Sequence, residues 1–233
     1  LWQDLAAPRR CVRFAMSGGT SQDELRCIEA HWKHGGWQVR AQGMGVHLHY
    51  RLSIAGRHNV KNSLAAAACA LAAGVSASAV EQGLQAFQPV KGRSRALEIA
   101  VQGRERTLVD DTYNANPDSV RAAIDVLADL PGPRILVLGD MGEVGHEGPA
   151  FHAEAGRYAL AKGIDQLLAH GNLVRSAVDV FPGARHFESM DELKDAVLAG
   201  LPHASSVLVK GSRFMRMERV VEAVVAHFSN GEL

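Results

Sequence analysis

From residue 92 onward the chain alternates short apolar runs with longer amphipathic stretches, which is the pattern of strands alternating with helices. This alternation favours an α/β fold with a doubly wound, mostly parallel sheet. We predict strands at 95–101, 106–109, 134–138, 166–170, 185–187 and 206–209. We predict helices at 118–130, 149–162 and 213–228, one from Asn172, and one from Ser189 with Glu192 completing a capping box.

The first part of the chain has a less regular pattern. Residues 1–46 predict short strands joined by turns, and the alternating segment 46–54 predicts a half-buried strand. An Ala-rich helix over 58–73 follows, with Gly74 as its C-cap. A second helix over 76–87 is capped by Ser76 or Ser78. We expect a boundary within 88–92 and divide the chain into domains 1–90 and 91–233.

The most informative polar segment is Asp-Asp-Thr-Tyr-Asn-Ala-Asn-Pro at 110–117, between a predicted strand and a predicted helix. Pro117 suits the first helical position and Asn116 suits the cap. Two carboxylates, a phenol and two amides therefore gather at the carboxyl end of a strand, where ligands bind in open α/β sheets. A capped polar turn is the alternative, but capping needs one Asn and explains neither the acidic residues nor Tyr113.

Three further polar segments follow predicted strands, at 139–145, 170–172 and 210–213. Because parallel strands end at one edge of a sheet, we expect all four segments to converge there. Lys210 and Arg213 place positive charge beside Ser212, at or near a helix N-terminus, which favours a carboxylate or phosphate ligand. The alternatives are a solvated basic turn at 210–213 and a Gly-rich turn with exposed acidic residues at 139–145.

Two other sets of residues are candidates for ligand binding. Asn59 and Asn62 are three residues apart and share one face at a helix start, and paired amides can bind the edge of a base. Helix capping by Asn59 is the alternative. Arg93 lies at the predicted boundary, where it could reach a bound phosphate or hold a hinge.

Composition limits the class of protein. The 233 residues contain 25 Lys and Arg against 25 Asp and Glu, so bulk charge indicates neither nucleic-acid binding nor a membrane surface. The three cysteines are scattered without metal spacing, which favours a cytoplasmic protein over a disulfide scaffold. No apolar run is long enough to span a bilayer. The histidines show no metal spacing, and we assign no metal ligand.

The motifs together resemble one family. Gly-Arg-His-Asn-Val-x-Asn, Lys-Gly-Arg, the 110–117 segment, Val-Leu-Gly-Asp-Met-Gly-Glu and Val-Lys-Gly-Ser-Arg occur in the order found in the ATP-dependent Mur ligases of peptidoglycan synthesis. The resemblance extends from about Leu52 to the end of the chain. It implies that 1–90 is the C-terminal part of a central ATP-binding domain and that 91–233 is a C-terminal Rossmann-like ligase domain.

The resemblance also implies a reaction. ATP and Mg²⁺ would activate the carboxylate of UDP-N-acetylmuramoyl-tripeptide as an acyl phosphate, which the amine of D-Ala-D-Ala would attack. By motif, Asn59 and Asn62 would contact adenine, Arg93 the phosphates as the catalytic arginine, and Asp111 the ribose. The residues implied near D-Ala-D-Ala are Asn114, Asn116, Lys210, Ser212 and Arg213. We expect a monomer that binds no nucleic acid and does not insert into a membrane.

Several motifs of the family are absent from this sequence. It lacks the phosphate-binding loop Gly-x-x-Gly-Lys-Thr/Ser, the Mg²⁺-binding Glu and His, and the modified Lys. We therefore expect the Mg²⁺ ligands upstream of this chain and expect the chain alone to be inactive. The other hypotheses are a sister Mur or folylpolyglutamate-type ligase, which the Tyr113–Asn116 run argues against, and a non-catalytic module that binds a nucleotide or peptide.

Overall fold

The computed structural model describes residues 11–17 and 24–229. The chain forms two compact units, Leu1–Gln88 and Pro89–Leu233, and each is considered by itself. Among the described helices, none has both the length and the apolar character that a membrane crossing requires.

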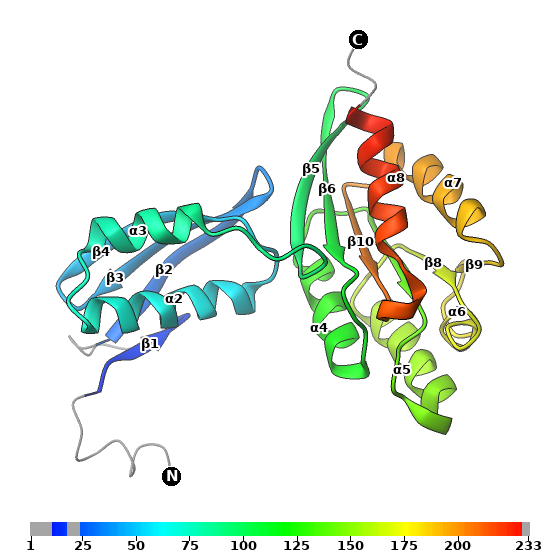
Figure 1. Cartoon of the computed structure of the whole chain (residues 1–233), viewed down its shortest axis with the longest axis horizontal. Coiled ribbons are helices and arrows are strands. Elements are labelled where there is room, and N and C mark those ends of the chain that lie inside the picture. The colour runs from blue at the N-terminus through cyan, green and yellow to red at the C-terminus, as the bar shows by residue number, and fades with distance from the viewer. Residues whose placement is uncertain (1–10, 18–23, 230–233) are drawn as a thin grey trace. The chain divides into compact units, whose positions relative to one another are not determined.

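The first unit is a four-stranded sheet in the order β1-β2-β3-β4, with two helices packed against it (Figure 1). Only β1 and β2 pair in parallel. Its elements are β1 (Arg13–Ala15), β2 (Glu24–Lys33), β3 (Gly36–Gly43), β4 (Val46–Leu52), α2 (Arg57–Ala72) and α3 (Ala77–Ala86). The core lies between the helices and the sheet, and Leu25, Val39, Tyr50 and Leu64 belong to it.

The helix signals of this unit are confirmed with small shifts. Helix α2 starts one residue before the predicted position, and Gly74 follows it with a φ of +88° that suits a left-handed C-cap. Ser76 caps α3, because its hydroxyl accepts a hydrogen bond of 3.3 Å from the backbone N–H of Ala79.

The second unit is a six-stranded sheet in the order β5-β6-β10-β7-β8-β9. Strand β5 is antiparallel to β6, and the other pairs are parallel, so the predicted mostly parallel sheet is confirmed. The strands are β5 (Arg95–Val101), β6 (Arg104–Asp111), β7 (Arg134–Gly139), β8 (Gln166–His170), β9 (Arg185–Phe187) and β10 (Ser206–Lys210). The helices are α4 (Pro117–Ala128), α5 (Gly148–Ala161), α6 (Arg175–Val178), α7 (Met190–Gly200), α8 (Glu218–Ser229) and the 3₁₀ turns η1 (Gly145–Glu147), η2 (Leu201–His203) and η3 (Arg213–Met215).

Helices cover both faces of this sheet, as the doubly wound prediction requires (Figure 1). Residues of α7 and α8 share one apolar core with the strands, to which Val137, Leu193, Val207 and Val220 belong. Helix α4 packs on β7 and β10, and α5 packs on α4. The carboxyl ends of the parallel strands β6, β10, β7 and β8 therefore lie at one edge of the sheet, and helices pack on both faces of that sheet.

Two helix predictions are wrong at their starts. The predicted helix 213–228 begins only at Glu218, because residues 213–215 form η3 and Arg216 is left-handed with φ +50°. Met217 packs so tightly against Gly211 that an added Cβ would lie 2.5 Å from its side chain. The segment 210–213 therefore does not lie at the N-terminus of an α-helix, and no helix dipole supports it.

The helix predicted from Asn172 is also much shorter than expected. Only Arg175–Val178 is α-helical. The backbone N–H groups of Asn172 and Val174 donate instead to the carboxylate of Asp140, at 3.0 and 2.8 Å. Residues 172–174 are therefore not helical, and the carboxylate that follows β7 anchors them.

Candidate active site

The four polar segments converge at the carboxyl edge of the second sheet, as predicted. Lys210 ends β10 opposite Asp111 of β6, and its Nζ lies 2.6 Å from Asp111 Oδ2 and 3.0 Å from the carbonyl oxygen of Asn114. The N–H of Gly142 donates to the carbonyl of Ala115 at 3.0 Å. These bonds join the segments that follow β6, β7 and β10.

Asp140 links the remaining segment to the others. Its carboxylate accepts from Asn172 and Val174, and its carbonyl accepts from both the N–H and the hydroxyl of Ser212, at 2.9 and 2.6 Å. Gly171 allows this approach, because it has φ +130° and an added Cβ would lie 2.4 Å from Asp140 Oδ1. Asp140 is buried, so its oxygens hold neighbouring loops together.

A second buried carboxylate holds the segment that carries Arg93. Asp110 accepts from the N–H of Gly92 at 3.0 Å and from the hydroxyl of Thr112 at 2.6 Å. The N–H of Tyr113 donates back to the carbonyl of Gly92 at 3.0 Å. The start of the second unit is therefore bonded to the end of β6.

Arg93 and Tyr113 form an exposed stack above this network. The guanidinium carbon of Arg93 lies 4.2 Å from the centroid of the Tyr113 ring, and the tyrosine is 46% exposed. A cation over an aromatic face is attracted by the ring quadrupole. The stack holds the guanidinium at the sheet edge while leaving it open to solvent, where it could meet an anionic ligand.

Asn114 and Asn116 are exposed and make local bonds. The side chain of Asn114 accepts from the N–H of Ala115 at 2.9 Å. Asn116 caps α4 by accepting from the N–H of Ser119 at 2.8 Å, and the Ser119 hydroxyl completes the capping box. The capped turn is thus present, and it presents the amides at the same edge as Lys210.

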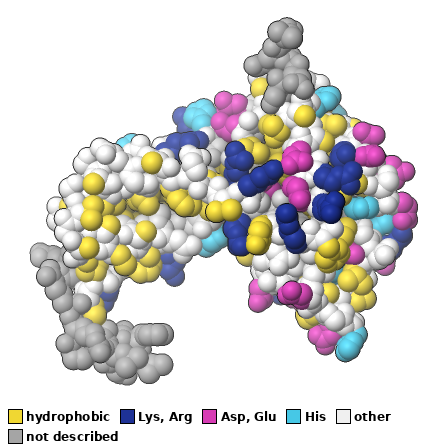
Figure 2. Space-filling model, viewed as in Figure 1, with side chains coloured by type: hydrophobic (Ala, Val, Ile, Leu, Met, Phe, Trp, Pro, Cys, Tyr) yellow, Lys and Arg dark blue, Asp and Glu magenta, His cyan; other side chains and the backbone are white. Residues whose placement is uncertain are grey.

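Ser212 and Arg213 differ in exposure. Ser212 is buried, with its hydroxyl used on Asp140. The side chain of Arg213 is 70% exposed, and its Nη1 lies 3.4 Å from Glu218 Oε1. Figure 2 shows Lys and Arg side chains gathered around acidic ones over α8, and the pair Lys91–Glu222 also involves this helix. Of Ser212 and Arg213, only Arg213 has a side chain exposed enough to contact a ligand.

His152 belongs to this edge but was not predicted. It is fully buried on α5, its Nε2 accepts from the N–H of Met141 at 2.9 Å, and its Nδ1–H donates to the carbonyl of Gly148 at 2.6 Å. These bonds define the neutral tautomer, and burial lowers the pKa of His152. No spacing in the sequence points to it, because its partners are backbone groups.

Asn59 and Asn62 lie in the first unit, near the start of α2. Asn62 Nδ2 donates to Asn59 Oδ1 at 3.2 Å, and Asn59 Nδ2 donates to the carbonyl of Ala55 at 2.7 Å. The N-cap of α2 is Gly56, and no side chain caps the free backbone N–H groups of the first turn. The hypothesis that Asn59 caps the helix is therefore wrong. The two amides share one face, as predicted, and offer both donors and acceptors to a base.

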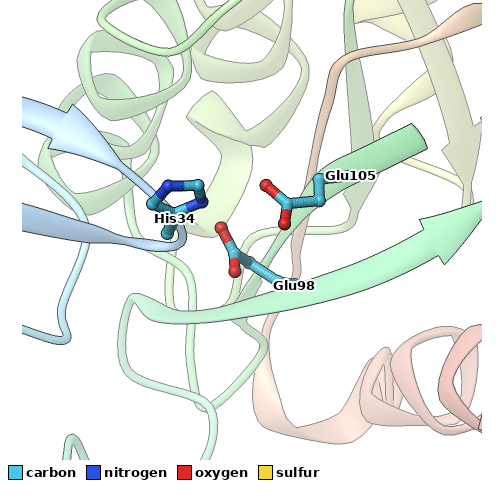
Figure 3. A group of neighbouring side chains, drawn as sticks. All are labelled: His34, Glu98 and Glu105. Atoms are coloured by element: carbon cyan, nitrogen blue, oxygen red, sulfur yellow. The ribbon is translucent and has the colours of Figure 1, made fainter.

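Three carboxylates of the sheet edge are used within the protein. Both oxygens of Asp110, Asp111 and Asp140 already accept hydrogen bonds from the protein. Figure 3 draws Glu98 and Glu105, which lie on the neighbouring antiparallel strands β5 and β6, together with His34 of the first unit. Because the two units are considered separately, we assign no metal site to this group.

Comparison with known proteins identifies the family. Residues 92–213 match the family model described as "Mur ligase, glutamate ligase domain". The chain belongs to the Mur ligase family, which confirms the resemblance in its motifs.

Relatives that resemble the chain over most of its length share one name. The UDP-N-acetylmuramoyl-tripeptide–D-alanyl-D-alanine ligase of Escherichia coli (strain K12) is 34% identical over 225 residues, which is 96% of this chain and 49% of that protein. MurF from Acinetobacter baumannii has a TM-score of 0.74 and 30% identity, covering 96% of this chain and 48% of that one. MurF ligase from Thermotoga maritima, solved in complex with ADP, shares the fold with a TM-score of 0.71, 21% identity and coverage of 88% and 47%. The chain thus spans about half the length of the curated relatives it matches.

Proposed function

We propose that the complete protein carrying this chain is an ATP-dependent ligase that joins UDP-N-acetylmuramoyl-tripeptide to D-Ala-D-Ala through an amide bond. The observation that carries the proposal is the exposed Arg93–Tyr113 stack above the bonded edge of a Mur ligase domain. The names of the relatives support the same two substrates.

Nucleotide contacts are assigned from the accessible polar groups. Asn59 and Asn62 present a paired amide face to adenine. Asp111 keeps a partly exposed carboxylate to which ribose hydroxyls can donate. When bound, ATP with Mg²⁺ would supply the phosphoryl group for an acyl phosphate. The guanidinium of Arg93 would stabilise the charge that develops on that group.

Acceptor contacts are assigned to the sheet edge. The exposed guanidinium of Arg213 can pair with the carboxylate of D-Ala-D-Ala, and Asn114 and Asn116 offer amides to its peptide group. Ser212 is buried and holds the 210–213 segment in place, since its hydroxyl donates to the carbonyl of Asp140. Lys210 is buried as well, and both of its bonds are made within the protein.

The test is a coupled assay of ADP release by the complete protein. We expect release that requires ATP, UDP-N-acetylmuramoyl-tripeptide and D-Ala-D-Ala together. D-Glutamate and diaminopimelate serve as acceptor controls and should not replace the dipeptide. Equal rates with one of them would assign the protein to a sister ligase, and binding of nucleotide without turnover would assign it to the non-catalytic class.

We further propose that the 233-residue chain alone does not turn over. Its sequence contains no Gly-x-x-Gly-Lys-Thr/Ser loop, whose backbone amides and Lys would hold the triphosphate. Turnover of the isolated chain at about 1 per second or faster, which is typical of enzymes, would contradict this. We place the reaction in the cytoplasm, supported by the sparse cysteines, and expect a monomer.

A further inference from the structure

Lys210 is a buried cation whose bonds are made within the protein. The residue is 2% exposed, and its Nζ donates to Asp111 Oδ2 at 2.6 Å and to the carbonyl of Asn114 at 3.0 Å. An ammonium has three N–H donors, so two of them are already used. A buried charge is stable only when it is paired and hydrogen-bonded, which explains both contacts.

Both acceptors of Lys210 belong to the segments that hold the exposed stack. Asp111 Oδ1 accepts from the N–H and the hydroxyl of Ser94, at 2.9 and 3.3 Å, and Ser94 directly follows Arg93. Asn114 directly follows Tyr113. The ammonium bonds directly to the carbonyl of Asn114 and, through the carboxylate of Asp111, indirectly to the backbone of Ser94, so it ties the backbone next to Tyr113 to the backbone next to Arg93.

The backbone at Ser94 has a conformation that its surroundings must hold. Ser94 is left-handed, with φ +49°, a conformation that residues other than glycine rarely adopt and that is kept only when the surroundings enforce it. Asp111 Oδ1 accepts from the backbone N–H of Ser94 itself, and Asp111 Oδ2 accepts from Lys210, while Asp110 and Tyr113 hold Gly92 two residues earlier. Losing the ammonium would leave Asp111 with a partly buried, unpaired charge, and the carboxylate that holds Ser94 would lose its own anchor.

We infer that Lys210 is a positioning residue for Arg93: its buried ammonium fixes the Arg93–Tyr113 stack and does not itself bind the acceptor dipeptide. The inference rests on the proposed function, because it assigns Arg93 to the reacting phosphoryl group. A dipeptide ligand would have to reach an ammonium that is 2% exposed and already paired with Asp111 at 2.6 Å, whereas the exposed Arg213 is open to it.

The kinetic test is a double-mutant cycle in the complete protein. Lys210→Met should lower kcat about tenfold or more while the KM for D-Ala-D-Ala changes less than about threefold, because Arg93 loses its orientation. In an Arg93→Ala background the same change should lower kcat less than about twofold, since both act through one group. A dipeptide KM raised about tenfold with kcat kept, or full additivity of the two changes, would overturn the inference.

A matched control removes another lysine with the same bond length. Lys162 Nζ lies 2.6 Å from Asp125, but these side chains are 40% and 45% exposed and lie at the C-cap of α5 and on α4. Lys162→Met should leave both kinetic constants within about twofold of the unchanged protein, as expected for exposed pairs.

A second readout does not depend on activity. Hydrogen exchange of the Ser94 amide in the 233-residue chain should become roughly tenfold faster or more in Lys210→Met, and stay unchanged in Lys162→Met. Should Lys210→Met not fold, Asp111→Asn tests the same tie by the same exchange. Unchanged Ser94 exchange would reject the tie. Absence of ligase activity in the unchanged complete protein would reject the proposed function instead.

Discussion

The start of α2 and the carboxyl edge of the second sheet hold their polar side chains in different ways. At α2, Asn59 and Asn62 bond to each other and to one carbonyl four residues back, all within a single helix start. At the sheet edge, the exposed Arg93 and Arg213 lie above buried groups that come from several strands. The first arrangement is local, and the second depends on the tertiary fold.

Because of this difference, we expect exposed side chains to serve binding and buried side chains to serve stability. An exposed side chain at either place can change without leaving a buried partner unsatisfied. A buried group such as Asp140 or Lys210 cannot, because an orphaned buried donor or acceptor costs about 1–3 kcal/mol. We therefore expect substitutions in the buried layer to lower stability, whatever they do to the kinetics, and substitutions in the exposed layer to leave stability nearly unchanged.

The largest expected effect comes from the buried layer at Gly171. Gly171→Ala should lower the free energy of unfolding by roughly 3 kcal/mol or more, because the new methyl meets Asp140 and the backbone is left-handed. Gly163→Ala is the control, since Gly163 has φ +73° but open space around it, and should cost only about 1–2 kcal/mol. Urea unfolding of the chain measures both, and equal losses would show that the contact with Asp140 does not matter.

The next effect comes from the exposed layer at Arg93. In the complete protein, Arg93→Ala should lower turnover on the order of 10²-fold with little change in melting temperature, because a guanidinium that meets transition-state charge is lost. Arg121→Ala removes a similar stack, 4.7 Å from the Tyr158 ring, and should leave turnover unchanged. Unchanged kinetics beside a lowered melting temperature would assign Arg93 to the hinge.

A smaller effect is expected at Arg213. Losing one charge-assisted contact costs about 1.5–3 kcal/mol, so Arg213→Ala should raise the KM for D-Ala-D-Ala roughly 10- to 150-fold. The KM for ATP should move little. Arg185→Ala removes another exposed arginine and serves as the control. An equal rise for both substrates would indicate an effect on domain closure and not a direct contact.

Most of the second unit was predictable because its local signals agree with its fold. Each buried strand is a short apolar run. Asn116 caps α4 and Ser189 caps α7, as their sequences predict. The convergence of four polar segments followed from parallel strands alone. The motifs then indicated the family, which residues 92–213 confirm.

The errors arise where tertiary contacts override local pattern. Residues 1–46 predicted only short strands, whereas β2 has ten residues, because a bulge between Cys27 and Glu29 interrupts its alternation. Helix α8 starts only at Glu218, after the left-handed Arg216 and after Met217, which packs against Gly211, and the residues before the short α6 are anchored by the carboxylate of Asp140. Such bonds join a side chain to the backbone of a distant segment, so no residue spacing in the sequence reveals them.

The smallest expected effect tests whether the buried layer responds to pH at His152. Folding lowers the pKa of this imidazole through burial, so between the folded value and the ordinary value of about 6.5 the unfolded chain binds more protons. Stability from His152 is therefore complete above about pH 6.5 and is lost as the pH falls below it.

His152→Gln keeps an acceptor for Met141 and a donor for Gly148 but does not titrate. Comparing urea unfolding at about pH 7.5 and about pH 5.5, the original chain should lose more stability than the variant. Equal losses would show that the neutral imidazole is not what the fold of the Gly139–Gly145 loop requires.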